Sequence, residues 1–139
     1  MIKPLEPKKA TAANKVQSCA QILSEKKAQD VVILDVRTLS SFADYFIICS
    51  GGSRRQVVAL AQHLEEALGR GGIKPLGIEG LAEGQWVLLD YNEIIVHIFY
   101  QPVREFYDLE GLWADAPRQL LEPTTDLTSE GSAVREYRA

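Results

Sequence analysis

The sequence lacks the residue patterns that build disulfide scaffolds, metal centres or membrane spans. Its two cysteines, Cys19 and Cys49, are too few for a disulfide framework, and no group of cysteines and histidines has the spacing of a zinc site. No apolar run is long enough to span a bilayer, and the N-terminal segment has no apolar signal core. We therefore expect a cytoplasmic protein that binds no metal and has no membrane partner.

The sequence also lacks an excess of positive charge, because the formal net charge is −4 and the isoelectric point is near 5.2. A protein that binds bare nucleic acid must replace the phosphate counterions with a basic face. The charge balance therefore argues against direct DNA binding. It leaves a basic protein partner open, since a mildly acidic surface would help to steer such a partner towards it.

The common catalytic motifs are missing as well. The chain has no Walker loop and no Gly-x-Gly-x-x-Gly fingerprint for a dinucleotide. Gly51-Gly52-Ser53 resembles the glycine-serine turn of nucleotidyltransferases, but the sequence lacks the Asp-x-Asp pair with which those enzymes hold magnesium. We expect no cofactor, no metal ligands and no catalytic residues, and so a protein that is not an enzyme.

One segment, Cys49-Ser-Gly-Gly-Ser-Arg-Arg55, keeps an enzymatic alternative open. A cysteine followed after five residues by an arginine, between a strand and a helix, is the skeleton of a cysteine phosphatase loop, in which a thiolate attacks phosphorus and the arginine holds the oxyanions. Ile48 replaces the usual preceding histidine, and Gln56 replaces the Ser or Thr that assists the leaving thiolate. The competing interpretation is a buried cysteine at the end of a strand, followed by a glycine turn into a helix.

Length and hydrophobic periodicity predict one domain of the α/β (α+β) class, with a mixed β-sheet flanked by helices. Ser53 and Gln56 have the spacing of a capping box at the start of the second helix. Residues 1–11 read as a charged lead-in, residues 12–116 as the domain, and the polar residues 117–139 as a tail that is disordered or ordered by a partner. The expected helices cover 11–27, 103–109 and the stretch between the glycine pairs at 51–52 and 71–72; the expected strands cover 31–36, 45–50, 74–78, 85–90 and 93–99.

The last two expected strands form a hairpin that carries the candidate binding residues. Trp86, Leu88 and Asp90 share one face of the first strand, because side chains alternate along a strand. Trp86 either packs in the core or anchors a partner, since tryptophan and tyrosine dominate interface hot spots. The same two interpretations apply to Tyr107 and Trp113 further along the chain. His97 is a lone histidine in a strand, and such a residue is most often a hydrogen-bonded structural residue.

Four segments, in this order, resemble the ribosomal silencing factor family, also called Iojap-like proteins. They are Ser41-Phe-Ala-Asp-Tyr-Phe-Ile-Ile-Cys-Ser-Gly-Gly-Ser-Arg-Arg-Gln-Val57, Gly84-Gln-Trp-Val-Leu-Leu-Asp90, Ile95-Val-His-Ile-Phe99 and Tyr107-Asp-Leu-Glu-Gly-Leu-Trp113. The resemblance runs from about residue 12 to residue 113 and leaves the tail out. It implies a nucleotidyltransferase-like fold without the metal site of the enzymes.

The resemblance also implies a function. It implies that the chain binds the large ribosomal subunit through its fourteenth-numbered ribosomal protein and blocks the joining of the small subunit, so that translation falls when nutrients are short. It implies a possible homodimer as well. Carried onto this sequence, the expected contact residues are Trp86, Leu88 and Asp90 on the hairpin, together with His97, Tyr107 and Trp113.

Overall fold

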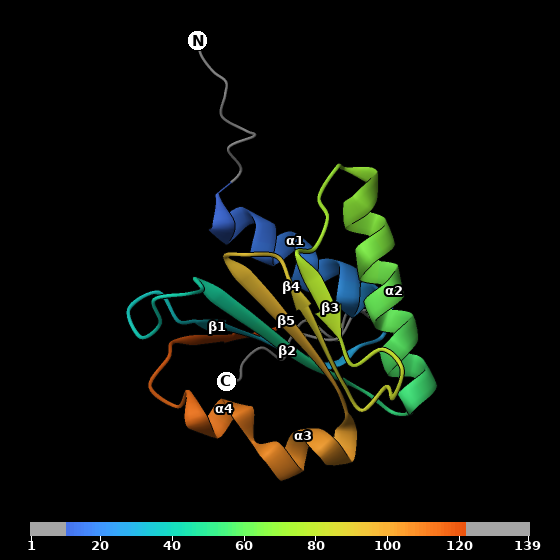
Figure 1. The fold of residues 1–139 in the computed structure, drawn as a ribbon. Coiled ribbons are helices and arrows are strands. Elements are labelled where there is room, and N and C mark those ends of the chain that lie inside the picture. The colour runs from blue at the N-terminus through green and yellow to red at the C-terminus, as the bar shows by residue number, and fades with distance from the viewer. Residues whose placement is uncertain (1–10, 122–139) are drawn as a thin grey trace, which may run out of the picture.

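The computed structural model describes residues 11–121, in which one mixed sheet lies between two layers of helix (Figure 1). The strands are β1 (Gln29–Asp35), β2 (Tyr45–Gly51), β3 (Gly77–Glu79), β4 (Trp86–Asp90), β5 (Ile94–Tyr100) and β6 (Arg118–Leu120). The helices are α1 (Ala12–Glu25), α2 (Arg54–Arg70), α3 (Gln101–Tyr107) and α4 (Leu109–Leu112). α1 and α2 cover one face of the sheet, and α3 and α4 lie against the other (Figure 1). The expected fold class is confirmed.

The strand order is β3-β4-β5-β2-β1-β6. β2 and β5 pair in parallel, from Tyr45 opposite Ile94 to Gly51 opposite Tyr100. The other neighbouring strands are antiparallel. A parallel pair needs a crossover, and α2 with the β3–β4 hairpin supplies it. Every residue of β2 is buried, which explains its unbroken apolar run.

The hydrophobic core has two parts, one on each face of the sheet. Side chains alternate along β5, so that Ile94, Val96 and Ile98 pack beneath α1 and α2. Phe99 points to the opposite face, where it packs with Phe46. This second part of the core is covered by the short helices α3 and α4, and the candidate binding residues lie at its border.

Side-chain caps begin the two long helices, and the cap of α2 at Ser53 is the one that the sequence predicts. Ser53 Oγ accepts from the backbone N–H of Gln56 at 3.1 Å. The side chain of Gln56 reaches back and accepts from the N–H of Gly52 at 2.6 Å, one residue before the position of an ordinary capping box. Thr11 caps α1 in the same way, by accepting from Asn14 at 3.1 Å.

Three details differ from the expectation. Residues 118–120, expected in the polar tail, form β6 and pair with β1 from Leu34 opposite Arg118 to Val32 opposite Leu120. All three residues of β6 are exposed, so no apolar alternation marks the strand. β3 occupies residues 77–79 rather than 74–78, and the single helix expected over 103–109 is divided at Asp108, whose φ is 47°. The lead-in before residue 11 and the tail beyond 121 lie outside the described residues.

Candidate functional site

The candidate residues of the hairpin lie on the side of the sheet that α3 and α4 cover in part. Val87 and Leu89 of β4 are buried on the other side, whereas Trp86, Leu88 and Asp90 are partly exposed. Cross-strand partners share a face, so Leu88 lies beside His97 and Trp86 beside Phe99. We call this surface the aromatic face and define it by Phe46, Glu79, Trp86, Leu88, Asp90, His97, Tyr107 and Trp113.

Ring contacts join most of the aromatic face into one chain. The Trp86 ring lies between Phe99 and Tyr107, with ring centroids 4.8 and 5.1 Å away. Phe46 then makes edge contacts with His97 at 5.1 Å and Trp113 at 5.0 Å. Such pairs add about 0.5–1.5 kcal/mol beyond the area that they bury. The structure therefore brings Trp86, His97, Tyr107 and Trp113 together, although they come from three different elements and the segment after α4.

Trp86 and His97 are also joined by a hydrogen bond. The indole Nε1–H of Trp86 donates to Nδ1 of His97 at 3.1 Å. His97 is only 5% exposed, and its Nε2 has no hydrogen-bond partner in the structure. Burial lowers the pKa of the imidazole to about 4, so that the side chain is neutral near pH 7. His97 therefore belongs to the buried base of the aromatic face, under its exposed residues.

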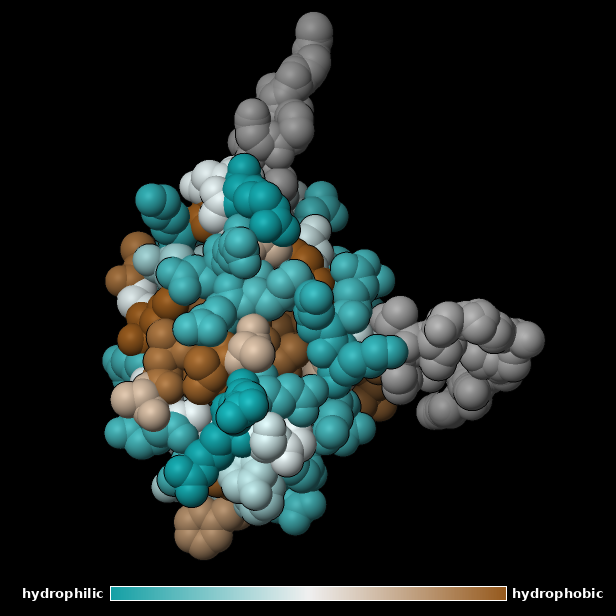
Figure 2. All heavy atoms as spheres, turned by 90° about the vertical axis from the view of Figure 1, so that its right-hand side faces the viewer, coloured by the Kyte–Doolittle hydropathy of each residue, from teal (hydrophilic) through white to brown (hydrophobic). Residues whose placement is uncertain are grey.

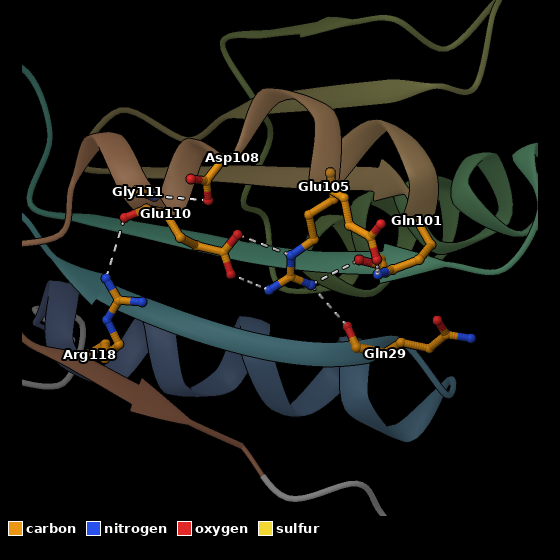
Figure 3. A network of polar contacts seen from close by, with 9 residues as sticks. Gln29, Gln101, Glu105, Asp108, Glu110, Gly111 and Arg118 are labelled. Carbon is orange, nitrogen blue, oxygen red and sulfur yellow. Dashed lines mark hydrogen bonds and ion pairs between the residues drawn. The ribbon is translucent and has the colours of Figure 1, made fainter.

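A buried ion pair fastens α3 and α4 to the sheet (Figure 3). The guanidinium of Arg104 donates to both carboxylate oxygens of Glu110, at 3.2 and 2.6 Å. It also donates to Ser50 Oγ at 2.8 Å, at the end of β2. Asp108, between the two helices, takes a left-handed backbone conformation and caps α4 by accepting from the N–H of Gly111 at 3.3 Å. These contacts place Tyr107 and Trp113 against the sheet.

Carboxylates line the outer edge of the aromatic face. Register pairs Gly77 with Asp90 and Glu79 with Leu88, so that Glu79 points to the same side as Asp90. Asp90 also accepts from the backbone N–H of Asn92 at 2.8 Å, which holds the hairpin turn. Asn92 has a φ of 73°, the left-handed conformation that asparagine tolerates in tight turns. An aromatic surface with an acidic border suits a basic partner.

Three residues of this region do not follow from the sequence patterns. Glu79 lies just outside the expected third strand, Phe46 lies within the strand expected over 45–50, and no motif marks Arg104. Phe46 could have been found only by knowing that β2 pairs with β5, which puts it opposite Ile95. The exposed ring of Phe42, 6.3 Å from Phe46, extends the aromatic chain into the loop before β2.

The phosphatase alternative finds no support in the geometry. Cys49 is fully buried beneath α1 and α2, and burial raises the pKa of its thiol to about 12. A thiol in this environment stays protonated near pH 7 and does not act as a nucleophile. Arg55 is exposed at the start of α2. In residues 11–121, no three His, Cys, Asp or Glu side chains are grouped so that they could hold a metal ion.

The side of the molecule that α2 covers has a different character. Figure 2 views the molecule from the side on which α2 lies in Figure 1 and shows mostly hydrophilic side chains, with apolar ones gathered towards the left of the view. Leu76, just before β3, is 73% exposed. Within the described part of the chain, no helix has the length and apolar character that a membrane span requires.

A partly exposed aromatic face on one side of a mixed sheet is typical of surfaces that recognise a partner. Comparisons with known proteins specify the class further. Residues 9–138 match the family described as ribosomal silencing factor during starvation. The ribosomal silencing factor RsfS of Bacillus subtilis is 41% identical over 98 residues, which are 70% of this chain and 83% of that protein.

Two further relatives agree. The chloroplastic protein Iojap of Arabidopsis thaliana is 30% identical over 104 residues, which are 70% of this chain and 40% of that protein. A crystal structure of a Chromobacterium violaceum protein has a TM-score of 0.71 at 31% identity and covers 85% of this chain and 95% of that one. The chain belongs to the ribosomal silencing factor family, which consists of ribosome-binding regulators rather than enzymes. The family match continues to residue 138, so the resemblance does not stop at Trp113 as expected.

Proposed function

We propose that this protein binds the large ribosomal subunit through the aromatic face and thereby blocks the joining of the small subunit, which represses translation when nutrients are limiting. The observation that carries the proposal is the partly exposed indole of Trp86, held between the rings of Phe99 and Tyr107. The names of the relatives, which call them ribosomal silencing factors, supply the ribosome as the partner.

The geometry around Trp86 suits a binding anchor. Binding costs about 0.5–1.5 kcal/mol for each flexible side chain that it immobilises. The indole of Trp86 is already restrained by two rings and by the hydrogen bond to His97, so a partner that covers it has less of this cost to overcome. A preformed aromatic group of this kind is a typical interface hot spot.

The charge of the border points to the kind of contact on the ribosome. Asp90 and Glu79 lie at the edge of the aromatic face, and the whole chain has a net charge of −4. A basic ribosomal protein is therefore the expected contact rather than ribosomal RNA, whose phosphates these carboxylates would repel. Within the large subunit, we propose the fourteenth-numbered protein, which the family resemblance implies.

Blocking of this kind needs no chemistry. A protein that occupies a surface used by the small subunit inhibits joining whenever its free concentration exceeds its dissociation constant. The mechanism is consistent with a chain whose candidate nucleophile, Cys49, is buried. Turnover is not required, and inhibition should depend on the ratio of this protein to large subunits.

The deciding experiment measures the binding of variants to purified large subunits. Trp86→Ala is expected to weaken binding by at least about thirtyfold, because truncating an aromatic hot spot costs about 2 kcal/mol or more. Asp90→Lys should weaken binding less, mainly by slowing association, and the effect should shrink as salt is added. The matched control is Glu66→Lys on α2, which makes the same charge change at a side chain that is 74% exposed on the other side of the sheet.

Melting temperatures separate binding from folding in this experiment. Trp86 is partly buried, so its truncation can also destabilise the domain, and Asp90→Lys then decides. Folded Trp86→Ala and Asp90→Lys proteins that bind and inhibit subunit joining as well as the Glu66→Lys control would refute the aromatic face as the docking surface. Sedimentation of the wild-type protein only at the top of a ribosome gradient would refute binding to the large subunit altogether.

Two finer points complete the proposal. We place the protein in the cytoplasm, because it is more similar to the Bacillus subtilis relative, at 41% identity, than to the chloroplastic Arabidopsis thaliana relative, at 30%. We also propose a homodimer, which exposed apolar side chains such as Leu76 would favour. Sedimentation equilibrium that finds only the 15.4 kDa monomer up to high micromolar concentration would contradict the dimer.

A further inference from the structure

The environment of His97 gives this residue a specific part in the aromatic face. It is a diagonal cross-strand neighbour of Trp86, because Trp86 lies opposite Phe99 and Leu88 lies opposite His97. The indole N–H of Trp86 points at Nδ1 of the imidazole, with 3.1 Å between the nitrogen atoms. This bond joins a partly exposed ring to one that is 5% exposed.

The bond fixes the tautomer of His97. An indole nitrogen is a donor only, so Nδ1 must carry a free electron pair and the proton of the neutral imidazole must lie on Nε2. Nε2 is buried without a hydrogen-bond partner, and a buried polar group in this state costs stability. A leucine or phenylalanine would avoid that cost while filling the same space. Histidine differs from these residues in having Nδ1, which accepts a hydrogen bond from the indole N–H of Trp86.

We propose that His97 is a positioning residue, whose Nδ1 holds the indole of Trp86 in the orientation that docks on the partner. This inference rests on the proposed function, because it assigns a role within the same docking surface. Phe99 and Tyr107 restrain the indole through ring contacts, but ring contacts alone do not distinguish the edge that carries the N–H from the opposite edge. The hydrogen bond makes that distinction and selects one orientation.

The variants His97→Asn and His97→Leu separate the effect of the hydrogen bond from that of packing, because asparagine and leucine have side chains of nearly the same size and shape. In His97→Asn, Oδ1 is bonded to Cγ as Nδ1 is in histidine, so it can accept from the same indole. In His97→Leu, a methyl group takes that place and cannot accept. We expect the asparagine variant to bind large subunits within about twofold of wild type and the leucine variant to bind about fivefold more weakly, although leucine suits a buried position better.

Nuclear magnetic resonance supplies the readout that packing would not change. The chain has two tryptophans, so the indole N–H region contains two signals, and Trp113→Phe assigns them. The Trp86 indole signal should stay near its wild-type position in His97→Asn and move in His97→Leu. In the wild-type protein, long-range nitrogen spectra should show His97 with a proton on Nε2 and none on Nδ1.

Each outcome decides between the two proposals. Leucine and asparagine variants that bind equally well, or an unchanged Trp86 signal in His97→Leu, would overturn the positioning role while leaving the docking face intact, provided that Trp86→Ala still binds poorly. A wild-type imidazole protonated on Nδ1 would overturn it without any variant. Wild-type binding by folded Trp86→Ala would instead overturn the proposed function itself.

Discussion

Replacing Glu110 by glutamine tests whether a buried ion pair holds α3 and α4 on the sheet. The side chains of Arg104 and Glu110 are only 8% and 21% exposed, and the closest of their contacts is 2.6 Å long. Removing one partner of a buried pair costs about 3–5 kcal/mol, because the other charge stays buried without compensation. Ser50 Oγ still accepts from Arg104 in this variant, and Glu110 has some contact with solvent, so we expect the lower end, about 3 kcal/mol.

Urea unfolding followed by circular dichroism measures this loss, which should lower the melting temperature by roughly 10 °C in a domain of this size. Glu66→Gln is the control, because its ion pair with Arg70 is long, at 3.9 Å, and exposed, so it should cost less than about 0.5 kcal/mol. The double variant Arg104→Met/Glu110→Leu should regain most of the loss, since no charge remains buried. A cost below about 1 kcal/mol for Glu110→Gln would refute the reasoning.

Further predictions concern His97, the cysteines and the glycine before the hairpin. The folded pKa of His97 is about 4, below the ordinary 6.5, so the unfolded chain takes up a proton first as the pH falls. Its contribution to the free energy of unfolding is therefore complete above pH 6.5 and decreases by about 3 kcal/mol towards pH 4. The His97→Leu variant should lack this part of the pH dependence. Urea unfolding that gives the same dependence of stability on pH for the wild type and the variant would contradict this prediction. Cys19 and Cys49 are buried, with pKa values raised to about 11 and 12, so a thiol reagent at pH 8 should label neither until the protein unfolds. Rapid labelling of the native protein would show that this account of the cysteines is wrong. Gly80 has a φ of 91°, and a Cβ there would collide with the carbonyl oxygen of Trp86, so Gly80→Ala should lower the melting temperature and weaken docking. Gly69→Ala on α2, where a Cβ meets no atom within 4 Å, is the matched control and should do neither.

Much of the fold follows from local sequence patterns. The cap of α2 at Ser53 and the alternation along β4 are local features, and the structure confirms both. The failures occur where local patterns carry little information. β6 is short and all its residues are exposed, and the break at Asp108 lies near the end of the helix expected over 103–109. The ion pair between Arg104 of α3 and Glu110 of α4 stabilises that break. Arg104 also donates to Ser50 at the end of β2. No local pattern indicates either contact.

The candidate site was predictable in part for the same reason. The shared face of Trp86, Leu88 and Asp90 follows from alternation within one strand. The bond between Trp86 and His97 depends on strand register, which the Tyr91-Asn92 turn sets and which the sequence did not specify to the residue. Phe46 and Glu79 join the face through pairing with β5 and β4, so only the complete sheet reveals them. The role of all these residues in docking stays a prediction.

The small strand β6 decides where a shortened version of this protein can end. It pairs with the outer edge of β1, and two flanking bonds extend the pairing, from Asp35 N–H to Pro117 O at 2.8 Å and from Leu121 N–H to Val31 O at 2.9 Å. A fragment that stops at residue 116 would leave β1 with unpaired backbone groups beside an apolar strand, and such an edge pairs readily with other chains. That fragment should aggregate during expression, whereas one that ends after residue 121 keeps its edge covered.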